Sequence, residues 1–259
     1  PASTRAVREQ RSPGGNLEES KWWSRLLLMC GAVSLVLLLT APLGHKFGVV
    51  ALGPSFMSLM AAVLLAVVVL IGGIVMAVIA GRKELGRDRS LCLIAAALGL
   101  LPILIMAPSV LAGGGVPPIH DITTDTADPP TFGAVLPLRV DAPNDVEYGQ
   151  PDLTAAEMAN LQRQAYPAVK TLRSDLPTEG ALDRAEAVLR EQGLEIVGRD
   201  AMRVEATATT FWFGFKDDVV VRVRGVDGGS LVDVRSVSRV GRSDLGANAR
   251  RIEGFLAAF

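Results

Sequence analysis

The sequence predicts a multi-pass α-helical membrane anchor of three transmembrane helices, followed by an α+β domain with a mainly antiparallel sheet packed by helices. Two observations predict this class. The 259-residue chain is 49% hydrophobic, with a mean hydropathy of +0.35, which is too apolar for one ordinary soluble domain. The apolar residues also concentrate in three uncharged runs, whereas alternating β-branched segments appear only near the end. We expect an N-terminal tail over 1–25, a membrane region over 26–112 and a domain over 113–259.

Charge divides the chain in the same way. Before Gly113 there are 10 Lys and Arg against 5 Asp and Glu, and from Gly113 onward there are 16 against 22. An acidic domain repels polyanions, so nucleic acid is not an expected partner. Cys30 and Cys92 both lie in apolar runs, where cysteine behaves as a small hydrophobe and no disulfide is expected.

The first apolar run, Leu26–Gly44, is just long enough to cross a hydrocarbon core of about 30 Å. Trp22 and Trp23 precede it beside basic residues, a composition typical of a membrane surface. A cleaved signal peptide has a similar basic start and apolar core. Because two further apolar runs follow, we expect this segment to be a retained span.

The second helix is expected over Ser55–Ala80, with Pro54 at its start, and the third over Ser90–Leu111. Pro102 and Pro108 remove backbone donors in the third helix, which predicts packing within a bundle. Ordinary bundle packing is favoured over a dedicated dimer motif. The small residues that would allow close contact between helices are Gly72, Gly73, Ala77 and Gly99.

Basic residues predict the orientation of the anchor. They precede the first helix and connect the second to the third, whereas the first loop carries only Lys46 and no Lys or Arg follows the third helix until Arg139. The positive-inside rule then places the N-terminus in the cytoplasm and the domain on the periplasmic side of the cytoplasmic (inner) membrane. The spans have no ionisable residue in their interior, which disfavours a transporter or pump.

The segment Pro117–Phe132, PPIHDITTDTADPPTF, is rich in proline and is expected to form an extended strap across the domain surface. Its acids and histidine are conceivable metal ligands, but no established metal motif is present. Local bonds from Asp and Thr side chains to turn backbone are the preferred interpretation. No metal and no cofactor are therefore expected.

Three helices are expected in the domain. Thr154 and Glu157 form a capping box at the first, and Thr178 is expected to cap the second, an amphipathic helix that ends at Gly193. A final helix begins near Asp244 and buries an apolar face.

Alternation and β-branched residues predict the sheet. In the last hairpin, valines share one face, and Arg222 and Arg224 share the other. Arginine-rich strand faces are most often solvated or paired across strands, so this face alone does not define a binding surface. The aromatic segment Phe211–Phe215 fits either a core corner or an apolar site. The expected strands are Leu194–Arg199, Arg203–Thr210, Val219–Val226 and Ser230–Val240.

The strap, together with RSVSRVGRSDLGANARRIEGFL over Arg235–Leu256, resembles the bacterial domain-of-unknown-function family 1499. The resemblance covers roughly Pro117–Phe259, and members with preceding membrane helices are part of the family pattern. No established activity comes with it. What it implies is a fold and a set of speculative ligand-binding positions: His120, Asp121, Asp125, Arg239, Arg242, Ser243, Asp244, Asn248 and Arg251.

The stretch Gly241–Asp244 directly precedes the final helix, where free backbone amides can hold an anion. The alternative is that Asp244 or Ser243 simply caps the helix. We further hypothesise that the strap brings Asp121 or Asp125 to Arg242 or Arg251 in buried polar contacts.

The sequence favours a non-enzymatic binding or scaffold module at the outer face of the membrane, with the lipid bilayer and another membrane or envelope protein as partners. It lacks nucleophile-elbow, P-loop, dinucleotide-binding and zinc-protease motifs, and no catalytic residue is assigned. One alternative is an accessory subunit of a larger membrane complex. Another is an envelope hydrolase or lipid-modifying enzyme, which would bring His120 together with acids or Ser243.

Overall fold

The computed structural model describes residues 19–259, so the basic residues expected in the N-terminal tail before Glu19 lie outside the described residues. Three apolar helices open the chain: α1 (Trp22–Lys46), α2 (Leu52–Arg82) and α3 (Gly86–Gly113). Each is long and apolar enough to cross a membrane, as predicted. The helices extend beyond the uncharged runs, and α2 begins before Pro54 because a first-turn proline needs no backbone donor.

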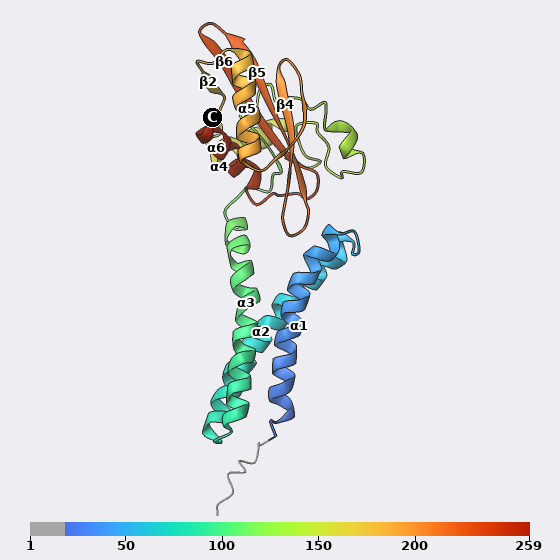
Figure 1. The fold of residues 1–259 in the computed structure, drawn as a ribbon, viewed down its shortest axis with the longest axis vertical. Coiled ribbons are helices and arrows are strands. Elements are labelled where there is room, and N and C mark those ends of the chain that lie inside the picture. Colours follow the sequence, from blue (N-terminus) through green and yellow to red (C-terminus); the bar gives the residue numbers. More distant parts are fainter. Residues whose placement is uncertain (1–18) are drawn as a thin grey trace, which may run out of the picture. The chain divides into compact units, whose positions relative to one another are not determined.

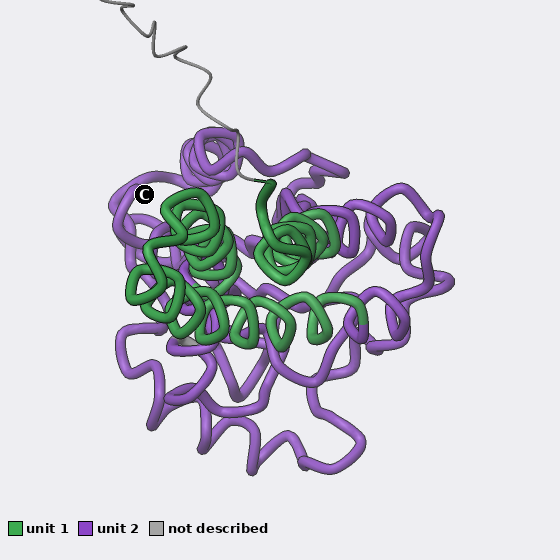
Figure 2. The backbone as a smooth tube through the Cα atoms, turned by 90° about the horizontal axis from the view of Figure 1, so that it is seen from below, with its two compact units in different colours: residues 1–38, 58–103 green, residues 39–57, 104–259 purple. Residues whose placement is uncertain are grey.

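The chain forms two compact units, which Figure 2 colours separately. One contains most of the helical segment, up to Leu38 and over Ser58–Ile103. The other comprises Leu39–Met57 together with Leu104–Phe259. The second unit therefore contains the end of α1 and the start of α2 in addition to the C-terminal domain.

Small residues allow α2 and α3 to pack closely in the first unit, as the sequence suggested. A Cβ added at Gly73 would lie 2.8 Å from the carbonyl oxygen of Cys92, and one added at Gly99 would lie 2.7 Å from that of Ala66. Both distances are too short for real contacts, so these glycines set the helix separation. The buried carboxylate of Asp88 accepts hydrogen bonds from groups in the first turn of α1.

The domain is α+β with a fully antiparallel sheet, as predicted (Figure 1). The strand order is β1-β6-β5-β4-β3, and β2 also pairs with β6. The strands are β1 (Asp121–Thr123), β2 (Leu172–Ser174), β3 (Glu195–Arg199), β4 (Arg203–Thr209), β5 (Lys216–Val226) and β6 (Gly229–Ser238). The helical elements are the 3₁₀ turn η1 (Leu136–Arg139), α4 (Ala155–Ala165), α5 (Thr178–Glu191) and α6 (Ala247–Ala258).

The two faces of the sheet have different covers. On one face, alternate residues such as Val219, Val221 and Val234 pack with buried residues of α5 and α6 to form the main core. The opposite face carries only a small apolar cluster, which includes Val220 and Val237. The segment between β1 and α4, which contains η1, contributes Phe132 and Val135 to that second cluster. We call this second side the loop-covered face.

Two local predictions are confirmed and two are wrong. The capping box at Thr154 is present, and Gly193 follows α5 with φ of +78°. Thr178 does not cap α5, because Pro177 occupies the cap position and makes no side-chain bond. The strap also does not lie merely across the surface. Its residues 119–123 are buried, because β1 adds a strand to the edge of the sheet beside β6.

Candidate functional site

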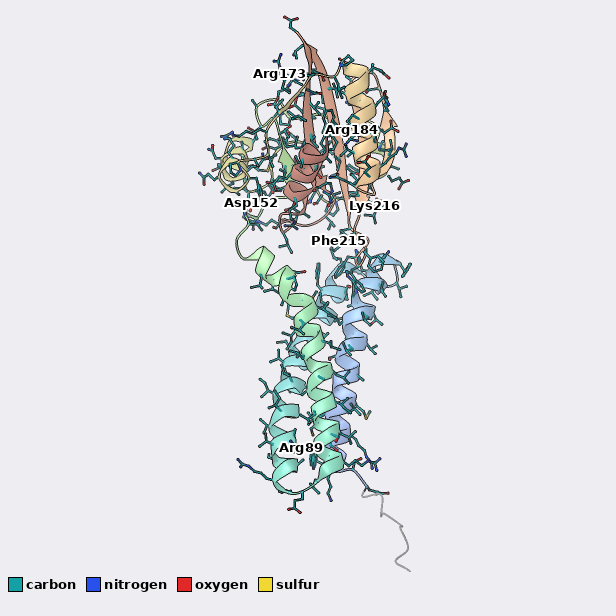
Figure 3. All side chains as sticks on the ribbon, turned by 60° about the vertical axis from the view of Figure 1, so that its left-hand side comes forward. Arg89, Asp152, Arg173, Arg184, Phe215 and Lys216 are labelled. Atoms are coloured by element: carbon teal, nitrogen blue, oxygen red, sulfur yellow. The ribbon has the colours of Figure 1, made fainter. Side chains whose placement is uncertain are left out.

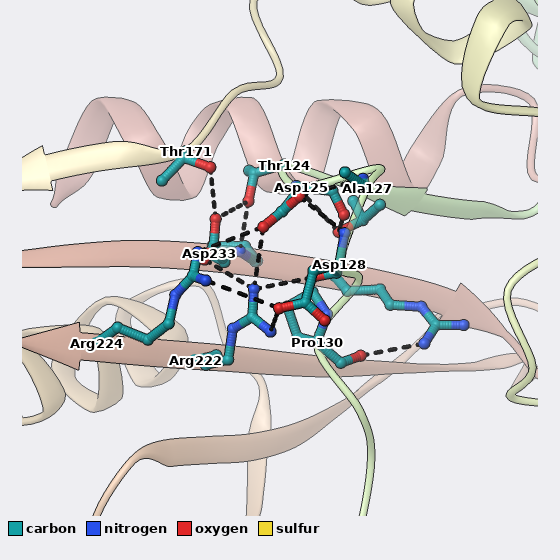
Figure 4. Close-up of polar contacts among 12 residues, drawn as sticks. Thr124, Asp125, Ala127, Asp128, Pro130, Thr171, Arg222, Arg224 and Asp233 are labelled. Carbon is teal, nitrogen blue, oxygen red and sulfur yellow. Dashed lines mark hydrogen bonds and ion pairs between the residues drawn. The ribbon is translucent and has the colours of Figure 1, made fainter. Parts of the chain in front are cut away.

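Asp233, on the loop-covered face of β6, is the centre of an ionic cluster that joins two strands and the strap (Figure 4). Its fully buried carboxylate accepts hydrogen bonds from Arg222 at 3.0 Å and Arg224 at 2.7 Å. Asp125 of the strap contacts the same two guanidinium groups at 3.2 and 3.3 Å. The charged strand face is therefore paired across strands and closed by the strap, and the pairing that the sequence suggested is present.

Asp121 forms a second pair on this face. Its buried carboxylate accepts two hydrogen bonds from Arg235, at 2.9 and 2.6 Å. The guanidinium also lies over the rings of Phe132 and Tyr148, 5.2 and 5.6 Å from their centroids. Such a bidentate pair between aromatic rings fixes the strap on the sheet and leaves the carboxylate no free face for substrate.

Asp218 receives two arginines, so its surroundings carry excess positive charge. Arg139 donates to it at 2.5 Å, Arg239 donates twice at 2.8 Å, and the Thr207 hydroxyl donates at 2.7 Å. Burial is the largest influence and raises the pKa of this carboxyl. The hydrogen bonds from the hydroxyl and the two guanidinium groups together outweigh burial, so the pKa lies below its ordinary 3.8.

Asn248 organises a third polar cluster, on the opposite face, at the start of α6. Its amide nitrogen donates to the carbonyl of His120 at 2.9 Å and to the Ser238 hydroxyl at 3.0 Å. Its amide oxygen accepts from Ser236 at 2.6 Å and from Arg251 at 2.5 Å. All four hydrogen-bonding capacities are used, so this buried amide joins α6 to β6 and to the residue that precedes β1.

His120 is 5% exposed, and within residues 19–259 its Nδ1 has no hydrogen-bond partner. Burial is the largest influence and lowers the pKa of the imidazole below its ordinary 6.5, against the opposing charge of Asp121. Among the described residues no hydrogen bond joins Ser243 to His120, and the Ser243 hydroxyl accepts from the backbone nitrogen of Leu245 at 3.3 Å in a local turn.

The backbone amides at the start of α6 are bonded within the chain, but not by a capping residue as predicted. Gly246 is the N-cap of α6 and makes no side-chain bond, so neither Asp244 nor Ser243 occupies the cap position. Asp244, two residues before the cap, accepts from the backbone nitrogens of Gly246 at 2.8 Å and Asn248 at 2.6 Å. Burial raises the pKa of Asp244, and these bonds oppose the shift. The amides that an anion would need are thus already occupied.

The predicted contacts between the strap and Arg242 or Arg251 are wrong. The exposed Arg242 pairs with Asp152, and Arg251 pairs with Asp217 at 2.7 Å. Asp121 and Asp125 pair instead with the strand arginines. The strap does pass the helix start, but through its backbone: the carbonyl of Ile119 accepts from the Asp244 nitrogen.

A groove of about 300 Å³ opens beside η1 at the end of the β4–β5 hairpin. Arg239 lines the groove, and the exposed Lys216 lies at its edge. We call it the cationic groove. Figure 3 labels Lys216 and the neighbouring Phe215. Apolar side chains, one acid and the histidine near the end of α1 also line the groove, among them Leu138, Val140, Asp141, Pro143, Phe215 and His45. Over residues 19–259 there is no cluster of three or more potential metal ligands from His, Cys, Asp and Glu.

The nine positions implied by the resemblance thus fall into separate places. His120, Asn248 and Arg251 meet at α6, whereas Arg239 alone lies in the groove. Sequence reasoning did not select Asp217, Asp218 or Lys216. The available signal was the triplet of one lysine and two acids that opens an otherwise valine-rich strand, because adjacent acids on a strand must face opposite sides of the sheet.

No curated protein and no solved structure matches the chain. A protein-family model does match, over residues 121–259, which is more than half of the chain. This match confirms the family suggested by the strap and the α6 motif. The chain belongs to the family described as "Protein of unknown function (DUF1499)".

Proposed function

We propose that this protein is a membrane-anchored, non-enzymatic binding module that holds an anionic amphiphile in the cationic groove. The observation that carries the proposal is the charge at the groove. Arg239, which lines the groove, shares the Asp218 carboxylate with the buried Arg139, so Asp218 neutralises only one of these two arginines. Lys216 adds a further cation at the edge, against one lining acid, Asp141. Apolar walls beside an uncompensated cation suit a ligand with an anionic head and an apolar portion.

The state of the acids supports binding over catalysis. General acid or base catalysis needs a group that can exchange a proton with substrate. Asp121, Asp218 and Asp233 are each fully buried and bonded to at least one guanidinium, and Asp244 is bonded to backbone amides. Groups held in this way stabilise the domain. The hydrolase alternative accordingly has no supporting contact in the described part of the chain.

The proposed location is the outer face of the cytoplasmic membrane, with the N-terminus in the cytoplasm. It is supported by the basic residues that flank α1 and connect α2 to α3. Single cysteines at Lys83 and at Asp227, in a chain without native cysteines, test it with a membrane-impermeant maleimide on intact cells. We expect labelling at Asp227→Cys alone, and labelling of Lys83→Cys alone would reverse the orientation.

Native mass spectrometry of the full chain in mild detergent tests the ligand. We expect phosphatidylglycerol to be retained over phosphatidylcholine with the same acyl chains. Lys216→Gln should weaken this retention about fivefold, the effect of roughly 1 kcal/mol from one exposed charge. Lys170→Gln removes an exposed lysine elsewhere and should leave retention unchanged.

Equal retention of the two lipids would refute the proposal, as would equal effects of the two lysine substitutions. Lipid bound around the membrane helices is common to all these variants, so only the difference between them reports on the groove. A stoichiometric protein partner without lipid preference would favour the accessory-subunit alternative.

A further inference from the structure

The loop between β4 and β5 presents aromatic side chains outside the core. Phe211 is 70% and Trp212 is 46% exposed, and their rings meet edge to face with centroids 5.2 Å apart. These two rings therefore do not form the core corner that was one of the two alternatives from the sequence. Exposed neighbouring aromatic rings on a domain surface indicate an interaction site.

The loop is held in one shape by its own hydrogen bonds. The Thr210 nitrogen donates to the Phe215 carbonyl at 2.8 Å, and the Phe215 nitrogen donates to the Thr210 hydroxyl at 2.9 Å. Gly214 takes a positive φ of +69°, which lets the chain turn back into β5. Phe211 and Trp212 are thus presented by a closed turn at the tip of a hairpin.

The other two rings of the loop contact the ends of the membrane helices within the same compact unit. Phe213 stacks on Phe56 near the start of α2, with centroids 5.2 Å apart, and Phe215 lies 5.7 Å from His45 at the end of α1. The Lys46 amine, at the last residue of α1, donates to the Phe211 carbonyl at 2.8 Å and lies 4.9 Å from the centre of its ring.

From these contacts we infer that the β4–β5 loop is a second membrane contact of the domain, with Phe211 and Trp212 inserted in the interfacial layer of the bilayer. The loop contacts the residues at which two spanning helices end, which is the level of the lipid headgroups. Aromatic rings and snorkelling lysines are enriched at that level because each has an apolar body and a polar group. The α1–α2 connection, which follows Lys46, also exposes apolar side chains: Phe47 is 72% and Val49 is 80% exposed.

This inference is independent of the groove ligand. It assigns the loop to lipid because the loop is continuous with membrane helix ends, whereas a second protein would need a surface that the bilayer leaves uncovered. If so, the domain contacts the membrane at the β4–β5 loop in addition to its covalent connection to α3.

Fluorescence of Trp212 in the full chain, reconstituted in phosphatidylcholine vesicles, tests the inference. The chain has two other tryptophans, Trp22 and Trp23, and replacing both by phenylalanine leaves Trp212 as the reporter. Lipids carrying bromine at a shallow acyl position should quench it roughly twofold more than lipids brominated near the chain end, because interfacial rings lie at headgroup level. Aqueous acrylamide should quench it weakly.

Met202→Trp, combined with Trp212→Phe in the same background, is the matched control. Met202 is 64% exposed in the turn at the opposite end of β4, so its indole should be quenched by acrylamide and not by brominated lipid. If the double phenylalanine chain does not fold, the difference between wild type and Trp212→Phe gives the same signal.

Two outcomes would overturn the inference. Strong acrylamide quenching of Trp212 without bromine quenching would place the loop in water. Protection of Trp212 from both quenchers would instead show that protein, and not lipid, covers it. Failure of the groove experiment would change neither reading.

Discussion

Replacing Asp218 by asparagine should destabilise the domain far more than its modest change in shape suggests. The substitution keeps the volume and one acceptor oxygen but removes the charge that two arginines share. Arg139 has a side chain only 4% exposed, so its guanidinium would be left buried without a counter-charge. Breaking a buried ion pair from one side costs about 3–5 kcal/mol, a large part of the roughly 5–15 kcal/mol that stabilises a domain.

Hydrogen exchange of the full chain in lipid nanodiscs measures this loss at the strands themselves. Amides of β5 and β6 that exchange only when the domain opens should exchange roughly 100- to 4,000-fold faster, since each 1.4 kcal/mol is a factor of ten. Asp183→Asn is the matched control, because it breaks an ion pair with Arg199 in which the Asp183 side chain is 64% exposed. That pair should contribute at most about 1 kcal/mol.

Acid should reproduce the effect. The folded pKa of Asp218 lies below the ordinary 3.8, so its ionised form stabilises the fold at every pH above 3.8. The stabilisation falls as the pH drops below 3.8 through the folded pKa. If Asp218→Asn accelerated exchange no more than Asp183→Asn, the ion pairs of Asp218 with Arg139 and Arg239 would contribute no more stability than an exposed contact, contrary to this prediction.

Two further outcomes follow from buried groups. Burial lowers the pKa of His120, so the unfolded chain binds a proton at this histidine more readily than the folded chain. The domain should therefore unfold more easily as the pH falls below 6.5. Hydrogen exchange should show this pH dependence in His45→Gln and lose it in His120→Gln. Gly99→Ala would press a methyl group against Ala66 and should cost about 1–3 kcal/mol of helix packing. Gly53→Ala meets no atom within 4 Å. In detergent, Gly99→Ala should therefore unfold at a lower temperature than Gly53→Ala. Equal unfolding temperatures would contradict close packing of α2 on α3.

Local signals predicted most of the elements. The lengths of the uncharged runs predicted the three membrane helices, and period-two alternation predicted the four longer strands. Thr154 and Glu157 predicted the start of α4. The strands β1 and β2 were not predicted, because three residues are too short to show a period. Their existence depends on pairing with β6, which no local pattern encodes.

The sequence also could not predict which charged residues pair with one another in the candidate site. Asp121 and Arg235 are 114 residues apart, and each has several equally suitable charges nearby in the sequence. From the sequence we hypothesise that acids of the strap pair with arginines, but the strand register decides which arginines they meet. Pairing β1 with β6 brings Asp121 opposite Val237, two residues from Arg235 on the same face, and so excludes Arg242 and Arg251.

The way in which the loop-covered face is covered explains why so many of its charged residues stabilise the fold. On the loop-covered face an irregular segment replaces a helix, so its backbone groups need partners from the sheet. Arg235 donates to the carbonyls of Pro130 and Val146 while it holds its carboxylate, and Arg239 donates to that of Leu138. A guanidinium with five donors can serve a carboxylate and a loop carbonyl together, which lysine cannot do in the same geometry.

The structural role of these arginines makes them unsuitable for testing function. Charge reversal at Arg239 or Arg235 would release the loop from the sheet, and a lost activity would report only unfolding. Lys216 is exposed, begins β5 and lies at the edge of the groove rather than beneath the loop. Its substitution changes the charge presented to a ligand while the buried pairs remain, so it separates binding from stability, which substitution of Arg235 or Arg239 cannot do.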